Sequence, residues 1–151
     1  MGYDFLRKKE IAIGSDLKRE YLKENLKEYL NEVRREFDDL GSGDYVEVAA
    51  DVARGVSEGG YKKGILICRT GQGMSIVANK FDSVFAARCL SVEDARDSRR
   101  VNNSNVLCLC EADVKLVRDI VYTWLNTEFC SSPKYVVALA QIKGLEDAIR
   151  R

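Results

Sequence analysis

The sequence predicts a single doubly wound α/β domain, with a five-stranded parallel sheet and helices on both faces. Short apolar runs alternate along the chain with longer amphipathic stretches. The strand-like runs lack polar alternation, as is typical of parallel strands covered on both faces. The length of 151 residues suits one domain, and no linker or internal repeat divides it. We therefore treat residues 1–151 as one domain.

The first part of the chain contains two predicted strands and two predicted helices. The apolar run at 10–15 predicts a buried strand, and leucines recur at helical spacing within 18–36. Residues 37–40 fit a second, short strand, and the Gly-Ser-Gly that follows predicts a turn. Asp44 is a suitable N-cap for a helix over 45–57, which carries valines at i, i+4 and i+8.

The rest of the chain repeats this pattern. The run KGILICR at 63–69 predicts a buried strand, and TGQGMS after it opens a helix that extends to residue 80. Two further apolar runs, at 84–89 and 105–110, complete the five expected strands. The remaining amphipathic stretches are predicted to be helical, at residues 92–101, 112–128 and 132–149.

Composition excludes several classes of function. The 24 basic residues balance 24 acidic ones, which argues against general binding to nucleic acid or to an anionic membrane. The chain has no histidine, so Ser-His-Asp triads, Cys-His pairs and histidine metal ligands are excluded. The five cysteines include no CxxC pair, so neither a zinc site nor a disulfide framework is expected. With no signal-peptide or membrane-spanning segment apparent, we expect a cytoplasmic protein without metal or cofactor.

In a sheet of this kind, ligands bind at the carboxyl ends of the strands, near the topological switch point. This rule selects the loops at 15–19, 68–75 and 90–94. The second is the most informative, because Cys68 ends a strand and a glycine-rich turn opens a helix. Such a helix start offers unpaired N–H groups to an anion or to a thiolate. The spacing alone equally fits a buried cysteine beside an ordinary turn, and it matches neither a Walker loop nor GxGxxG.

Several segments resemble the family of ribose-5-phosphate isomerase B and galactose-6-phosphate isomerase. The resemblance spans the chain from Ile11 to about residue 145. The segments that carry it are IAIGSD at 11–16, GILICRTGQGMSIVANK at 64–80, AARC at 86–89, NNSNVLCL at 102–109 and VYTWL at 121–125.

The resemblance implies an aldose–ketose isomerase of a sugar phosphate similar to ribose 5-phosphate, acting through a cis-enediolate. It implies that Cys68 is the base, with Thr70 beside it and Asp16 as an acid. It also implies a homodimer or tetramer in which residues of one chain complete the site of the other. It further implies that the amides of Gly71, Gln72, Gly73 and Met74 form an anion hole, and that Arg99 and Asn102 match an Arg and an Asn of the family's site. Apart from the resemblance, the helix start predicts that an anion binds along the amides from Gly71 to Ser75, helped by the cations Arg69 and Arg19, although Arg19 equally fits a solvated residue of a first turn.

The chain departs from the family pattern where histidines are usual. The family has Asp-His-Ala-Gly after the first strand, whereas this chain has Asp16-Leu17-Lys18-Arg19. The family histidine implied in ring opening falls on Leu90, and the arginines of the C-terminal segment are missing. These departures leave two alternatives: a non-catalytic or hetero-oligomeric relative that binds a sugar phosphate, or an isomerase of an acyclic or short-chain sugar phosphate.

Overall fold

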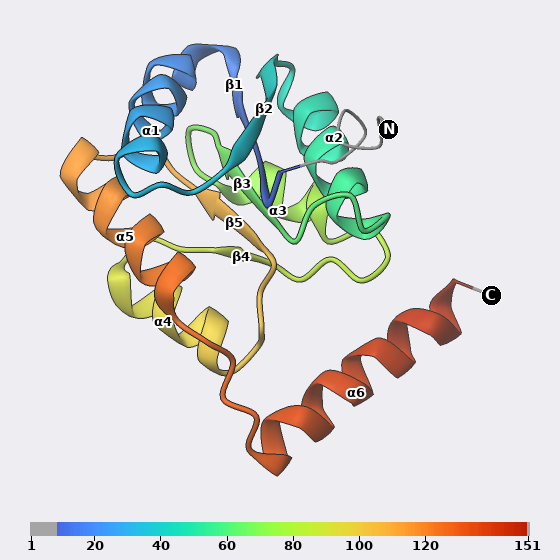
Figure 1. The fold of residues 1–151 in the computed structure, drawn as a ribbon. Helices are drawn as coiled ribbons and strands as arrows, with labels where there is room; N and C mark the ends of the chain where they lie inside the picture. Colours follow the sequence, from blue (N-terminus) through green and yellow to red (C-terminus); the bar gives the residue numbers. More distant parts are fainter. Residues whose placement is uncertain (1–8, 151) are drawn as a thin grey trace, which may run out of the picture.

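A five-stranded parallel sheet, with the strand order β2-β1-β3-β5-β4, lies at the centre of the computed structural model, which describes residues 9–150 (Figure 1). The predicted fold class is therefore confirmed. In chain order the elements are β1 (Ile11–Asp16), a 3-10 turn η2 (Leu17–Arg19), α1 (Glu20–Glu32), β2 (Phe37–Gly43), α2 (Tyr45–Ser57), β3 (Lys63–Ile67), α3 (Gln72–Ala78), β4 (Ala86–Arg88), α4 (Val92–Arg100), β5 (Val106–Leu109), α5 (Val114–Asn126) and α6 (Pro133–Ile149).

The second strand differs from the prediction, because the Gly-Ser-Gly expected as a turn belongs to β2. The pairing of β1 with β2 shifts register between Ile13 and Ser15. Gly41 has a φ of +116°, a value that L side chains rarely adopt. The glycine thus accommodates an irregularity within the strand and does not end it.

Side chains alternate between two cores, one on each face of the sheet. Ile11 and Ile13 point towards the face covered by α1, α4 and α5, whereas Ala12 points towards α2 and α3. The first core contains Trp124, which is fully buried and donates its indole N–H to Ser104 Oγ at 2.8 Å. Among residues 9–150, no helix combines the length and hydrophobicity that a membrane span requires.

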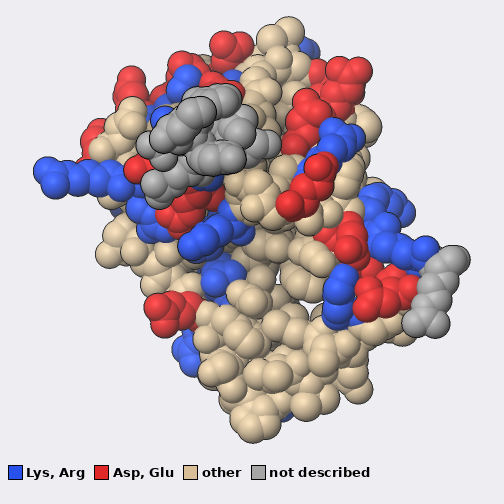
Figure 2. All heavy atoms as spheres, turned by 45° about the vertical axis from the view of Figure 1, so that its right-hand side comes forward, with Lys and Arg blue, Asp and Glu red and all other residues tan. Residues whose placement is uncertain are grey.

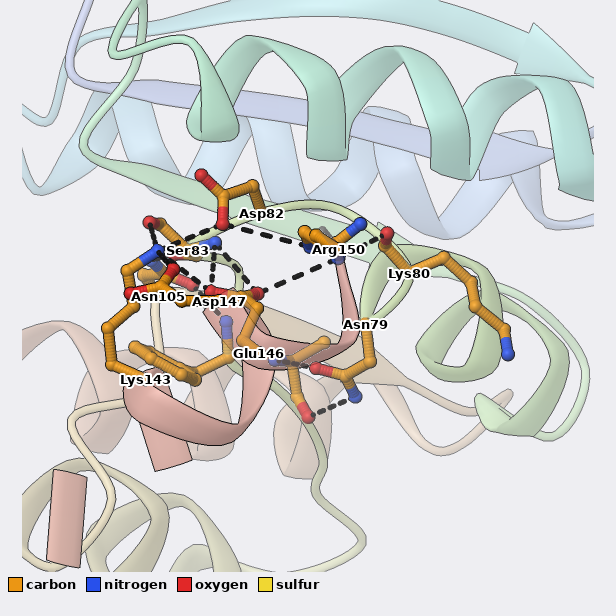
Figure 3. Close-up of polar contacts among 11 residues, drawn as sticks. Asn79, Lys80, Asp82, Ser83, Asn105, Lys143, Glu146, Asp147 and Arg150 are labelled. Atoms are coloured by element: carbon orange, nitrogen blue, oxygen red, sulfur yellow. Dashed lines mark hydrogen bonds and ion pairs between the residues drawn. The ribbon is translucent and has the colours of Figure 1, made fainter. Parts of the chain in front are cut away.

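The last helix, α6, extends away from the sheet and has no buried residue (Figure 1). Its C-terminal part is attached to the turn after α3 by a cluster that we call the α6 latch: Asp82, Ser83, Lys143, Glu146 and Arg150 (Figure 3). Lys143 Nζ lies 2.9 Å from both Asp82 Oδ1 and Glu146 Oε2. The Glu146 carboxylate accepts the Ser83 backbone N–H at 3.0 Å. The latch therefore holds the C-terminal end of α6 against the turn after α3.

Candidate functional site at the carboxyl edge of the sheet

A cavity of about 440 Å³ opens where β1, β2 and β3 end. A larger hollow, of about 510 Å³, lies at the opposite edge of the sheet, among charged surface side chains and two glycines. Its lining contains no thiol and no hydroxyl side chain, so the candidate chemistry belongs to the smaller cavity. The residues that line the smaller cavity are Asp16, Tyr45, Cys68, Arg69, Thr70, Gln72, Gly73 and Ile76.

Cys68 stands at the end of β3, directly beside the loop that opens α3. Its backbone N–H still donates to Leu109 O at 3.1 Å, so the pairing with β5 fixes its position. Its side chain lines the cavity although the residue is only 6% exposed. The Gly71 N–H donates to Cys68 Sγ at 3.1 Å. The sulfur is therefore held at the cavity wall by a backbone donor of the loop that opens α3.

The loop after Cys68 presents backbone amides at the cavity. Gly71 has a φ of +74°, which turns the chain into α3. The Gln72 N–H donates to Thr70 Oγ1 at 3.3 Å, and the Ser75 N–H already donates to Gly71 O. Helix geometry leaves the amides of the intervening residues, Gly73 and Met74, without intrahelical partners, so these two can bind an anion.

The loop is also held from the outside. Arg88, at the end of β4, donates its Nε–H to Thr70 O at 2.7 Å. Arg69 is exposed and lines the cavity, so its guanidinium is available to an anionic ligand. The predicted residues of the second loop are therefore brought together, but three of the predicted amides, those of Gly71, Gln72 and Ser75, already donate within the loop and the helix.

Asp16 and Arg19 lie at the end of β1, but they are placed differently. Asp16 lines the cavity, and its Oδ1 accepts the Arg19 backbone N–H at 2.8 Å. Arg19 is only 7% exposed and is not among the residues that line the cavity. The sequence suggested an exposed cation for binding an anionic substrate; the structure places this guanidinium inside the protein.

Arg99 and Asn102 lie at the opposite, amino edge of the sheet and do not approach Cys68 within one protomer. Arg99 is 8% exposed, and its Nε–H donates to Thr127 O at 3.1 Å. It also donates to the carbonyl of Ser104, just before β5, while Asn102 is exposed in the turn after α4. Any part that these two residues take in catalysis therefore depends on a partner subunit.

Two cavity residues, Tyr45 and Ile76, were missed by the sequence reasoning. Tyr45 begins α2 and lies over Gly73, so closely that a Cβ added at Gly73 would meet the Tyr45 ring at 2.6 Å. The strand-end rule could have found it, because the loop after β2 opens on the same edge. Conversely, the predicted loop at 90–94 does not line this cavity in the described chain.

The other cysteines of the sheet are poor candidates for the same role. Burial raises the pKa of Cys89 to about 11 and also raises the pKa of Cys108, which is fully buried. Cys130 differs, because a hydrogen bond from the Ser132 backbone lowers its pKa. It follows α5, however, far along the chain from the cavity loops, and does not line the cavity.

Fold and site together define a doubly wound α/β protein with a cysteine, a carboxylate and a glycine-containing helix start at the carboxyl ends of its strands. The model of the Ribose/Galactose Isomerase family matches residues 11–142, and the chain belongs to this family. The resemblance noted from the sequence is thereby confirmed.

Known proteins support this assignment along most of the chain. Ribose-5-phosphate isomerase B of Escherichia coli is 38% identical over 80% of this chain and 86% of its own. D-erythrulose-4-phosphate isomerase of Pectobacterium atrosepticum is 35% identical over 79% of this chain and 84% of its own. The structure of ribose-5-phosphate isomerase B of Clostridium thermocellum matches with a TM-score of 0.88 at 36% identity, covering 93% of this chain and 99% of that one.

Proposed function

We propose that this protein is an aldose–ketose isomerase of a sugar phosphate, with Cys68 as the base. The observation that carries the proposal is the cavity that Cys68 shares with Asp16 and with the opening of α3. The chain's membership of an isomerase family supports the same chemistry. All five cysteines are free thiols, which supports a reducing, cytoplasmic location.

The proposed reaction moves one proton between two carbons and another between two oxygens. The Cys68 thiolate takes the proton from C2 of the open-chain aldose and returns it to C1, which yields the ketose. The intermediate is a cis-enediolate, and its charged oxygen accepts hydrogen bonds from the amide N–H groups of Gly73 and Met74. Asp16, which lines the same cavity, passes the hydroxyl proton between O1 and O2.

We propose that the substrate is a four-carbon sugar phosphate rather than ribose 5-phosphate itself. Ribose 5-phosphate closes a furanose ring through O4, and opening that ring needs an additional acid. The chain contains no histidine to supply it. In a tetrose 4-phosphate, O4 is esterified, so no five-membered ring forms. A relative whose substrate is D-erythrulose 4-phosphate supports this choice.

The test compares isomerisation of D-erythrose 4-phosphate, D-erythrulose 4-phosphate and ribose 5-phosphate, each beside its unphosphorylated form. We expect turnover of the four-carbon phosphates, and its loss in Cys68→Ala. The matched control is Cys130→Ala, which removes a partly exposed thiol outside the cavity and should retain activity. Full activity of Cys68→Ala would refute the cysteine base. Absence of turnover with any sugar phosphate would favour the non-catalytic alternative.

We further propose that the protein is a homodimer or a dimer of dimers that uses α6. Val136, Val137 and Leu145 on this helix are 46%, 55% and 65% exposed. A hollow of about 430 Å³ separates α6 from Phe85 of the main body. Where α6 begins, at the lower end of Figure 2, the surface carries few charged side chains. Large exposed apolar patches of this kind are typical of protein interfaces.

Sedimentation velocity at micromolar concentration tests the oligomer. Wild-type protein should sediment as a dimer or tetramer, and Leu145→Glu should shift it towards the monomer. Lys115→Glu, an exposed charge change on α5, is the control and should leave the assembly unchanged. A monomeric wild type would contradict the proposal.

A further inference from the structure

The guanidinium of Arg19 is buried at the edge of the sheet where the cavity opens. Arg19 ends the 3-10 turn after β1, and it is only 7% exposed. Its Nε has no accessible surface and no hydrogen-bond partner among the described residues. A buried cation of this kind is costly unless nearby negative charge offsets its desolvation.

Arg19 approaches both oxygens of the Asp16 carboxylate, one through its backbone and the other through its guanidinium. The Arg19 backbone N–H donates to Oδ1 at 2.8 Å, and Nη1 lies 3.9 Å from Oδ2. Asp16 is the only carboxylate among the described residues that line the cavity. The backbone contact is the N-cap of the 3-10 turn and is independent of the side chain at position 19, so the contribution of the guanidinium to the orientation of Asp16 is its charge beside Oδ2.

The same guanidinium also lies near Glu111, which follows β5. Its Nε lies 3.6 Å from Glu111 Oε2, which also accepts the Tyr21 hydroxyl at 2.7 Å. The Glu111 backbone N–H donates to Arg69 O at 3.1 Å. Because β3 lies between β1 and β5, this chain of contacts crosses the end of β3. It ties Asp16 to the backbone next to Cys68.

We infer that Arg19 is a positioning residue, which holds Asp16 in place for proton transfer, and not a group that binds the substrate phosphate. The inference rests on the proposed isomerase function. A phosphate that approached this guanidinium would meet the carboxylates of Asp16 and Glu111, which repel it. Arg19 also lies outside the lining of the cavity, whereas Arg69 is exposed within it.

Steady-state kinetics of Arg19→Gln and Arg19→Lys distinguish the two roles. A positioning residue affects kcat, whereas a phosphate-binding residue affects KM and the inhibition constant of inorganic phosphate. For Arg19→Gln we expect kcat to fall about 10- to 100-fold, less than the roughly 100- to 10,000-fold that general acid–base catalysis contributes because Asp16 itself remains, with KM changed less than about threefold. Arg19→Lys keeps a cation near Oδ2 and should restore part of kcat. Lys18→Gln removes the same charge from an exposed neighbour and is the control.

A double variant tests whether Arg19 acts through Asp16. If it does, Asp16→Asn combined with Arg19→Gln should be no slower than Asp16→Asn alone, because coupled residues are not additive. Multiplying effects would overturn the inference, as would a tenfold rise in KM and in the phosphate inhibition constant with kcat retained. Should Arg19→Gln fail to fold, Arg19→Lys gives a milder form of the test, in which kcat falls by a smaller factor and KM stays unchanged. If the wild-type protein shows no turnover, both the proposed function and the inference are refuted. If the wild type is active but Arg19→Gln changes KM and not kcat, only the inference is refuted.

Discussion

Replacing Gly71 with alanine tests how far catalysis depends on the backbone conformation of the loop after Cys68. Gly71 has a φ of +74°, a conformation that costs an L-residue about 1–2 kcal/mol. A Cβ there would also lie 3.3 Å from Arg88 Cγ and 3.4 Å from Cys108 O, so the loop must shift by a few tenths of an ångström. At roughly 2–4 °C per kcal/mol for a chain of this size, the melting temperature should fall by about 2–8 °C.

The effect on activity should exceed this loss of stability. Any rotation of the peptide that relieves the strain turns the Gly71 N–H away from Cys68 Sγ, which it now meets at 3.1 Å. A hydrogen bond to a charged group contributes about 1.5–3 kcal/mol. If it supports the thiolate in the transition state, kcat/KM should fall about 10- to 100-fold at 25 °C, where the variant remains folded.

Gly59→Ala provides the matched control. Gly59 has a φ of +79°, but a Cβ there meets nothing within 4 Å, and the residue lies in the turn after α2. Its variant should lose a similar amount of stability and keep its activity. Equal losses of activity in both variants would mean that general destabilisation explains the effect. Full activity of Gly71→Ala would show that the contact with sulfur does not assist catalysis.

Two further predictions concern the thiols and pH. In a variant whose two partly exposed cysteines are replaced by serine, iodoacetamide should label Cys68 faster than Cys89 and Cys108, because burial raises the pKa values of those two thiols. A substrate should protect Cys68 from labelling. Equal labelling of the three cysteines, measured by peptide mass spectrometry, would contradict the prediction. Burial tends to raise the pKa of Asp39, but hydrogen bonds from Lys23 and Lys27 outweigh it and lower the pKa below the usual 3.8. The ionised carboxylate therefore stabilises the fold above about pH 4, and this stabilisation is lost as the pH falls through the lowered pKa of Asp39. In urea unfolding, Asp39→Asn should reduce the free energy of unfolding at pH 7 and reduce it much less at pH 2.

Periodicity was sufficient to predict the architecture, because a doubly wound sheet buries its strands completely and leaves a clear apolar signal. It failed at residues 41–43, where glycines look like a turn but accommodate a shift in strand pairing. The strand-end rule placed Asp16 and Cys68 in one cavity, because both follow adjacent parallel strands. Tyr45 was missed, since it reaches the cavity only by packing against Gly73, a contact between distant segments.

Charged residues were the least predictable part of the site. A sequence gives the sign of a side chain but not its direction, and both Arg19 and Arg99 are buried by contacts with acceptors far along the chain. Arg19 lies near the carboxylate of Glu111, and Arg99 donates to the carbonyl of Thr127. Only Arg69, whose backbone is fixed at the end of β3, remains exposed in the cavity as expected.

One compound can decide whether the protein rejects ribose 5-phosphate because its ring must be opened or because its carbon chain is too long. Isomerisation needs one group for the C–H proton and one for the O–H proton, and the cavity supplies Cys68 and Asp16. Ring opening adds a third transfer, to O4, and the described lining of the cavity offers no further carboxylate and no histidine for it. The 4-deoxy analogue of ribose 5-phosphate has five carbons but cannot close a furanose ring. We expect it to be isomerised at a rate comparable to that of D-erythrose 4-phosphate, and ribose 5-phosphate much more slowly. If the analogue is as poor a substrate as ribose 5-phosphate, the cavity selects by length, and the absence of a ring-opening acid does not determine the specificity.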